Sequence, residues 1–262
     1  MADHNEAIRA QFRIQAATFD DTGFAVAGLD WIVTGLEPSP TDMVLDVAAG
    51  AAHVGRALAP HVAHVSALDL TPEMLHQGQR LAVGAGLRNI AFLTGDAVAL
   101  PWLDGQFDLT VCRLALHQVA DPGAVVREMV RVTRPGGRIG VIDLTAVDDP
   151  AAAAEADRIE RLRDPSHATT LTAQQIHDLL GRSGAEVTSV TAHDQPVEVE
   201  DWMERTRTEP VVRDVIRARF DEELRGGRPS GLRPFRDDTD ALWLTHTWTM
   251  TVGRKTSDGS PA

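Results

Sequence analysis

The stretch MVLDVAAGAAHVG, residues 43–55, runs from an apolar segment straight into a series of alanine and glycine residues. An apolar run of this kind that carries an aspartate near its end, here Asp46, is typical of a buried strand leading into a turn. Gly50 and Gly55 lie where a tight turn needs residues without a side chain. Ala52 stands where a second turn glycine is expected, and its methyl group would crowd a ligand that approaches the backbone. The stretch predicts a strand followed by a ligand-binding turn.

Strand and helix patterns alternate on both sides of this stretch, after a helical N-terminal segment that ends at the proline-containing residues 37–40. Strands are predicted at 43–47, 64–70, 90–96, 107–116, 137–144, 185–194 and 241–253. Helices are predicted at 53–60, 71–86, 121–133, 148–164, 172–184 and 198–227. This alternation favours an α/β fold in which helices cover both faces of a mostly parallel, doubly wound sheet.

Composition limits the class of protein. The 262 residues are 43% apolar and 24% charged, as in an ordinary globular protein. A net charge of -13 argues against nucleic acid or an anionic membrane as partner, because phosphate binding needs clustered cations. No apolar run is long enough to span a membrane and the start is too polar for a signal peptide, so we expect a cytoplasmic protein. The single cysteine, Cys112, excludes an intrachain disulfide, and no metal site is predicted.

Acidic residues recur where the predicted strands end. Asp46 ends the first strand, Asp69 the second and Asp96 the third, while the fourth runs into Cys112–His117. Ligands of open α/β sheets bind at the carboxyl ends of the strands, where an acidic residue after the second strand suits ribose hydroxyls. A dinucleotide site would need a G-x-G turn, which this chain lacks, and Asp46 would repel a phosphate. A cofactor with an ammonium and a sulfonium group suits Asp46 better.

Four motifs in this order resemble those of the class I S-adenosylmethionine-dependent methyltransferases, in particular the small-molecule group of ubiquinone and menaquinone biosynthesis. They are VLDVAAGAAHVG, VSALDLTPEML, FLTGDAVALPWLDGQFDLTVCRLALHQVADPGAVVREMVRVTRPGGRIGVIDL and RLRDPSHATTLTAQQIHDLLGRSGAEV, about half of the chain together. The resemblance implies a Rossmann-like, mostly parallel sheet of seven strands with helical lid elements. One domain would then contain an N-terminal helical lid at 1–40, a cofactor-binding core at 41–150, the remaining sheet with a helical substrate-lid insertion at 151–254, and a flexible tail at 255–262.

The resemblance also implies contacts to S-adenosylmethionine, whose demethylated product is S-adenosylhomocysteine. It assigns them to Asp46, Gly50, Ala52, Asp69, Leu70, Met74, Asp96, Ala97, Cys112 and Arg113. Asp46 would face the methionine part, Asp69 the ribose and Asp96 the adenine amino group. Arg113 would contact the methionine carboxylate or the methyl acceptor.

Two histidines are candidates for a general base. His117 follows the fourth strand, where an acceptor would lie, and an imidazole has a suitable pKa to take a proton from OH or NH. Capping of a loop explains His117 equally well. His167 is the second candidate, with Asp164 as an orienting partner, and stabilisation of a turn is its alternative role. Phe12 and Phe19 of the N-terminal lid would close over cofactor and acceptor.

The predicted reaction is methyl transfer to an O, N or C nucleophile of a small molecule, such as a quinone-like, aromatic or natural-product intermediate. Two alternatives stay open: a non-methylating cyclisation or rearrangement on the same fold, and a non-catalytic small-molecule-binding module. Residues 205–236 hold nine arginines against five acidic residues, which suits either an anionic or carrier-bound acceptor or a solvated helix face. Trp202, Trp243 and Trp248 would line an aromatic pocket or belong to the core. A homodimer is left open.

Overall fold

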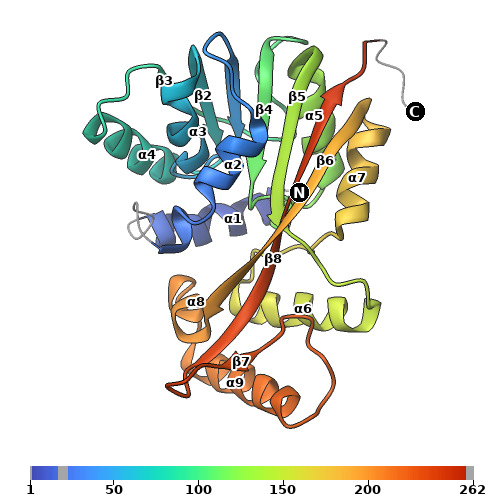
Figure 1. Ribbon diagram of the computed structural model, residues 1–262. Helices are drawn as coiled ribbons and strands as arrows, with labels where there is room; N and C mark the ends of the chain where they lie inside the picture. Colours follow the sequence, from blue (N-terminus) through green and yellow to red (C-terminus); the bar gives the residue numbers. More distant parts are fainter. Residues whose placement is uncertain (1, 17–22, 258–262) are drawn as a thin grey trace.

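The computed structural model describes residues 2–16 and 23–257, which form one sheet flanked by helices and a smaller helical unit at one end (Figure 1). The strands are β1 (Met43–Val47), β2 (His64–Asp69), β3 (Ile90–Thr94), β4 (Phe107–Arg113), β5 (Thr133–Leu144), β6 (Ala185–Glu198), β7 (Phe235–Arg236) and β8 (Leu242–Lys255). The α-helices are α1 (Ala2–Gln15), α2 (Leu29–Leu36), α3 (His53–Leu58), α4 (Pro72–Gly84), α5 (Pro122–Val132), α6 (Pro150–Arg163), α7 (Ala173–Arg182), α8 (Val199–Arg205) and α9 (Pro210–Leu224). The 3-10 helices are η2 (Gly23–Ala25) and η3 (Ala59–His61). Phe19 and most of the predicted tail lie outside the described residues.

The strand order is β3-β2-β1-β4-β5-β8-β6, with the short β7 paired to β8. β1 to β5 run parallel, whereas β8 is antiparallel to both β5 and β6. This order confirms the predicted methyltransferase-type α/β fold. Because parallel strands end at the same edge of the sheet, the carboxyl ends of β1, β2 and β4 meet there.

Alternate strand residues face opposite helical layers. Val44 and Val65 pack with α2 and α3 on one face, and Leu45 and Leu68 pack with α5 and α7 on the other. All four side chains are fully buried, and burial of each stabilises the fold by about 1.5–3 kcal/mol. The sheet is therefore a rigid base for the loops at its edge.

Only part of the predicted N-terminal lid covers this edge. α2 contributes the fully buried Ile32 and Leu36 to the core, beside β5 and β8. α1 instead lies across the carboxyl ends of the strands (Figure 1). Among the described residues of the predicted lid, α1 and η2 line the cavity at this edge and α2 belongs to the core.

A second unit, which we call the lid unit, is built on the extensions of β6 and β8 beyond the sheet. The pairing of these strands continues to Glu198↔Trp243, further than predicted. α6, α8 and α9 pack around the extension through a separate buried cluster that includes Trp202. The single helix predicted at 198–227 is wrong, because Pro210 begins a new helix, α9, and cannot continue the previous one.

Two details of the core also differ from prediction. The Pro-Gly-Gly turn lies inside β5, where the register against β4 shifts and Gly136 has a φ of +72°. Lys255 belongs to β8 rather than to the tail, and its ammonium donates hydrogen bonds to the carbonyls of Arg131 and Thr133.

In the described part of the chain, no helix is both long and apolar enough to cross a membrane.

Candidate functional site

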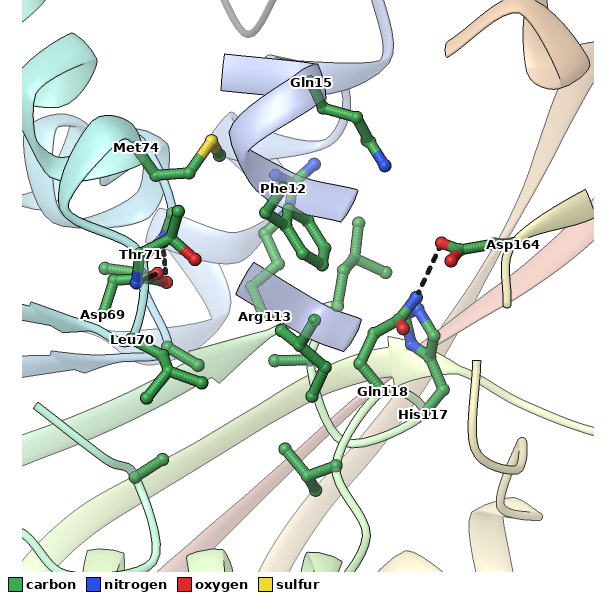
Figure 2. Close-up of a pocket in the computed structure, with 18 of the residues that line it drawn as sticks. Phe12, Gln15, Asp69, Leu70, Thr71, Met74, Arg113, His117, Gln118 and Asp164 are labelled. Carbon is green, nitrogen blue, oxygen red and sulfur yellow. Dashed lines mark hydrogen bonds between the residues drawn. The ribbon is translucent and has the colours of Figure 1, made fainter. Parts of the chain in front are cut away.

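A cavity of about 370 Å³ lies at the carboxyl ends of the parallel strands. Strand-end loops, α1 and the lid unit all contribute to its walls. Figure 2 shows Asp69 and Met74 at one end, His117 and Asp164 at the other, and Phe12 of α1 between them. We refer to these as the core end and the lid end of the cavity.

Asp46, at the end of β1, lines the cavity and is only 2% exposed. Its Oδ2 accepts a hydrogen bond from the Gly55 amide at 2.8 Å, which folds the turn back onto the strand end. A Cβ atom at position 55 would lie 2.9 Å from this oxygen, so glycine fits there and alanine does not. Burial raises the pKa of Asp46 to about 7, against the lowering effects of the Gly55 amide and the Arg113 guanidinium. A cation bound beside Asp46 would stabilise its ionised form.

Ala52 does not have the role predicted for it. It is fully buried, does not line the cavity, and caps α3 with a φ of +53°. Its methyl group therefore does not crowd a ligand there. Alanine at this position instead strains the backbone, because a left-handed conformation is about 1–2 kcal/mol less favourable for a non-glycine residue. Gly50, with a φ of +56°, does line the cavity.

Asp69, at the end of β2, connects two loops. Its Oδ2 accepts from the Gly50 amide at 2.7 Å and its Oδ1 from the Thr71 amide at 2.8 Å. Burial raises the pKa of Asp69 despite these two hydrogen bonds. A carboxylate oxygen accepts more than one hydrogen bond, so both atoms retain capacity for hydroxyl donors. Leu70 and Met74 line the cavity beside Asp69 (Figure 2).

Asp96, after β3, is hydrogen bonded to α1. Its Oδ2 accepts from Asn5 Nδ2 at 2.9 Å and its Oδ1 from the Val98 amide at 3.1 Å. Asn5 thus donates to a carboxylate oxygen of Asp96, the residue that the resemblance assigns to the adenine amino group. Ala97 also lines this end of the cavity. No local pattern marks Asn5 as a partner of Asp96, because the contact depends on how α1 packs.

Cys112 does not have its predicted role, whereas Arg113 does line the cavity. Cys112 is buried in the core and does not line the cavity. Arg113 lines the cavity, but its terminal nitrogens donate to the backbone carbonyls of Phe24, Ala25 and Ala27 at 3.3, 3.0 and 3.0 Å. The guanidinium therefore holds the segment around η2 in place, while its Nε is buried without a hydrogen-bond partner among the described residues.

His117 lines the lid end and is held by a carboxylate. Its Nδ1 lies 2.5 Å from Oδ1 of Asp143. The same Oδ1 accepts from the Leu144 amide, and Oδ2 accepts from the Leu116 amide, at 2.7 Å each. With Nδ1 bound in this way, Nε2 is the nitrogen left for a reacting group. Burial disfavours the charged imidazole, but the Asp143 carboxylate outweighs burial and raises the pKa of His117.

Asp143 is a residue of the site that was not predicted from the sequence. It lies near the end of β5, next to β4, and is only 2% exposed. The available signal was an aspartate in the motif VIDL, which ends a strand in the same way as Asp46 ends β1. Only the parallel pairing of β4 and β5 brings this carboxylate next to His117.

His167 lies behind His117 and not in the cavity. The two ring centroids are 5.8 Å apart, and the His167 side chain is fully buried. Its Nε2 is 2.9 Å from Oδ1 of Asp157, whereas the predicted partner, Asp164, accepts from Ser166. This geometry excludes His167 as a base in direct contact with an acceptor bound in the cavity.

The lid end also contains side chains from α6, α8 and β8. These are Arg163, Trp202, Arg205 and His246. Trp202 belongs both to the core of the lid unit and to the cavity wall, so the two predicted alternatives for this residue apply together. Trp248 is fully buried and does not line the cavity.

Comparisons with known proteins agree with this geometry. A methyltransferase-domain family matches residues 45–141. The chain is 32% identical to the uncharacterized methyltransferase YcgJ of Bacillus subtilis over 63% of this chain and 65% of YcgJ. It is 32% identical to the uncharacterized protein YafE of Escherichia coli over 61% of this chain and 77% of YafE. It is 43% identical to the demethylmenaquinone methyltransferase of Mycolicibacterium vanbaalenii, over 42% of this chain and only 45% of that enzyme.

Solved structures extend the likeness to almost the whole chain. The crystal structure of YcgJ has a TM-score of 0.79 at 24% identity and covers 88% of this chain and 99% of YcgJ. The structure of BH2331 from Bacillus halodurans has a TM-score of 0.78 at 25% identity and covers 90% of this chain and all of BH2331. The strand order, the carboxylates at the strand ends and these matches lead to one conclusion: the chain belongs to the class I S-adenosylmethionine-dependent methyltransferases.

Proposed function

We propose that this protein transfers a methyl group from S-adenosylmethionine to an O, N or C nucleophile of a small molecule, a quinone-like, aromatic or natural-product intermediate. One observation carries the proposal. Asp46, Asp69 and Asp96 converge on the core end of a cavity whose lid end holds His117, bound to Asp143. The core end of the cavity thus suits a cationic nucleoside, and the lid end provides a general base.

The residues of the core end fit the cofactor. Asp46 would face its ammonium group, Asp69 its ribose hydroxyls, and Asp96 its adenine amino group once Asn5 moves aside. Gly50 leaves space for a close approach, since a Cβ atom there would already lie 3.1 Å from the methyl group of Met74. When bound, S-adenosylmethionine supplies an electrophilic methyl group attached to a sulfonium.

The chain itself contributes alignment and proton transfer. Displacement at a methyl carbon requires the nucleophile and the leaving sulfur to lie in line, which a closed cavity favours by holding both partners. α1 helps to close it, because Asn5 bonds to Asp96 in the core and Gln11 donates to the Thr206 carbonyl of the lid unit at 3.3 Å. His117 would take the proton from an acceptor OH or NH through Nε2.

Calorimetric titration with S-adenosylmethionine and S-adenosylhomocysteine tests the cofactor part of the proposal. We expect both to bind the unmodified protein, and Asp46→Ala to weaken binding by about 100-fold because it removes the carboxylate partner of a desolvated ammonium. Arg9→Ala is a suitable control, since Arg9 is a partly exposed residue of α1 that does not line the cavity, and its ion pair with Glu6 stays within that helix.

Transfer of labelled methyl groups to a panel of phenols, quinols, amines and enolisable carbon acids tests the reaction. Product formation that requires His117 for the OH and NH acceptors would support the proposal. Absence of cofactor binding at millimolar concentration would contradict it. Binding without transfer across the panel would favour the non-methylating step on the same fold.

A further inference from the structure

Arg205, the last residue of α8, is a half-buried cation that lines the lid end of the cavity. Its guanidinium lies 4.5 Å from the ring centre of Phe24, in cation–π contact. Among the residues that the structure describes, none forms a hydrogen bond or an ion pair with this guanidinium. Burial and the nearby Arg163 lower the pKa of Arg205 to about 10, so the side chain is charged at neutral pH. A partly desolvated cation of this kind favours the binding of an anion.

The other arginines of the lid unit show a different arrangement. A first group pairs with carboxylates at 2.6–2.7 Å: Arg213, Arg217, Arg219, Arg233 and Arg236. A second group is exposed to solvent: Arg207, Arg225 and Arg228. Within residues 205–236, Arg205 is thus the arginine that has neither full solvation nor a carboxylate partner among the described side chains.

The buried carboxylates near Arg205 lie against other groups, and the exposed Asp201 forms no ion pair with it among the described residues. Glu160 is 2% exposed and lies 3.0 Å from Arg163 and 3.3 Å from His246. Burial opposes the charge of Glu160, but Arg163 and His246 outweigh burial and hold its pKa well below the usual range. Asp164, which also lines this end, accepts hydrogen bonds from the amide and the hydroxyl of Ser166.

A further donor lines the same end of the cavity without a partner. Trp202 is 1% exposed. Its indole Nε1 is buried without a hydrogen-bond partner in the described part of the chain. An unpaired buried donor costs free energy, and an oxygen of a bound anion would satisfy it.

The methionine carboxylate of the cofactor is the competing anion. It shares a carbon atom with the ammonium group that we place beside Asp46, at the core end. The charges that shift the pKa of Arg205 come instead from its own surroundings in the lid unit, namely Arg163, Glu160 and Asp201. Arg205 therefore lies on the acceptor side of the cavity.

We propose that the methyl acceptor carries a carboxylate or phosphate group on an aromatic or otherwise unsaturated body, and that Arg205 binds this anionic group. The proposal rests on the proposed methyl transfer and narrows its substrate class. A guanidinium binds both kinds of anion through two parallel hydrogen bonds. Phe24 and Trp202 provide flat apolar surfaces for the unsaturated body.

Calorimetric titration of the S-adenosylhomocysteine complex with benzoate, phenyl phosphate and benzamide tests this proposal. Benzamide has the shape of benzoate without its charge. We expect at least one of the anions to bind about tenfold or more tightly than benzamide, and the difference between the two anions identifies the group that the site prefers. Arg205→Gln should remove the preference, whereas Arg205→Lys should retain part of it because the charge is kept.

Arg217→Gln is the matched control, since it removes one positive charge from α9 at a residue that pairs with Glu200 and does not line the cavity. An unchanged preference in this variant excludes a general effect of net charge. The proposal is wrong if the unmodified protein shows no preference for the anions, or if Arg205→Gln retains it. It is also wrong if Arg205→Gln weakens the binding of S-adenosylhomocysteine as strongly as the binding of the anion, because Arg205 would then bind the cofactor.

These outcomes differ from failure of the proposed function. A protein that binds neither S-adenosylmethionine nor S-adenosylhomocysteine would contradict methyl transfer. The same three probes, titrated into the unliganded protein and its Arg205 variants, would still decide whether the lid end is an anion site.

Discussion

His117 and Asp143 form a buried pair in which Nδ1 of the imidazole lies 2.5 Å from Oδ1 of the carboxylate. The contact joins the loop after β4 to the neighbouring strand β5. It fixes the ring orientation, leaves Nε2 for the cavity and raises the pKa of His117. A carboxylate in this position therefore acts on both the geometry and the proton affinity of the candidate base.

Asp143→Asn is expected to slow transfer to an OH or NH acceptor by about 10- to 100-fold, because the ring loses its orientation and part of its basicity. His117 accepts a proton only when neutral, so the rate falls as the pH drops through its pKa. Asp143 raises that pKa, and its replacement should move the acidic limb of the kcat profile to lower pH. The measurement is kcat between about pH 5 and 9. If Asp143→Asn binds the cofactor normally and the acidic limb of its kcat profile does not move, His117 and Asp143 do not take part in proton transfer.

Ala52→Gly should stabilise the protein without changing its affinity for S-adenosylhomocysteine. Glycine relieves the left-handed strain at a φ of +53°, but it also gains freedom in the unfolded chain, so the net gain is about 0.5–1 kcal/mol. The melting temperature should rise by about 1–4 °C. Ala51→Gly is the matched control: this neighbour is fully buried against Met74, and its replacement should lower the melting temperature. Tighter cofactor binding by Ala52→Gly would show that the methyl group does crowd the ligand.

Cofactor binding should depend on pH through Asp46. In the free protein its pKa is about 7, and the ammonium group of a bound cofactor would favour the ionised form, so binding below pH 7 releases a proton. Affinity for S-adenosylhomocysteine should be about tenfold weaker at pH 6 than at pH 8. Calorimetric titration in buffers of different ionisation enthalpy measures the number of protons released on binding, because each released proton adds the buffer's ionisation enthalpy to the observed heat. Asp46→Asn should lose most of this dependence, and a pH-independent affinity in the unmodified protein would contradict the assignment.

The same carboxyl group should oppose folding at alkaline pH. The pKa of Asp46 is raised from 3.8 to about 7 in the folded state, so folding takes up a proton between these values and stability falls as the pH rises through them. Asp46→Asn should therefore raise the melting temperature at pH 8 by several degrees more than at pH 5, as thermal denaturation at both values would show. An equal change at the two pH values would mean that burial does not perturb this group.

Asn5→Ala should accelerate cofactor association. The Asn5 amide donates to Asp96 at 2.9 Å, and this bond must break before an adenine amino group can use the same oxygen. Loss of one partly exposed hydrogen bond corresponds to about a three- to tenfold faster association, measured by stopped-flow fluorescence. Arg9→Ala changes α1 at a partly exposed residue outside the cavity and should leave the rate unchanged. An unchanged rate in Asn5→Ala would show that α1 does not limit entry.

The sequence by itself determined the sheet and its ligand-binding edge. Strand patterns with terminal aspartates predict where Asp46, Asp69 and Asp96 lie, because parallel strands must end at one edge of the sheet. The start of the helix predicted at 121–133 is equally local, since an N-cap depends on neighbouring backbone amides: Asp121 caps α5 and accepts from the Ala124 amide at 2.8 Å. Such features depend on periodicity and on neighbours in the chain.

Only the tertiary structure decided what the side chains at that edge contact. Asp143 reaches His117, Asn5 reaches Asp96 and Arg113 turns to carbonyls around η2, and each contact joins residues distant in the chain. The backbone conformation of Ala52 was equally hidden, because a left-handed alanine persists only where the surrounding turn imposes it. Arg205 could not be distinguished from its neighbours by sequence, since its lack of a carboxylate partner follows from the packing of the lid unit against the cavity. Local patterns specify elements, whereas long-range packing specifies which charges meet.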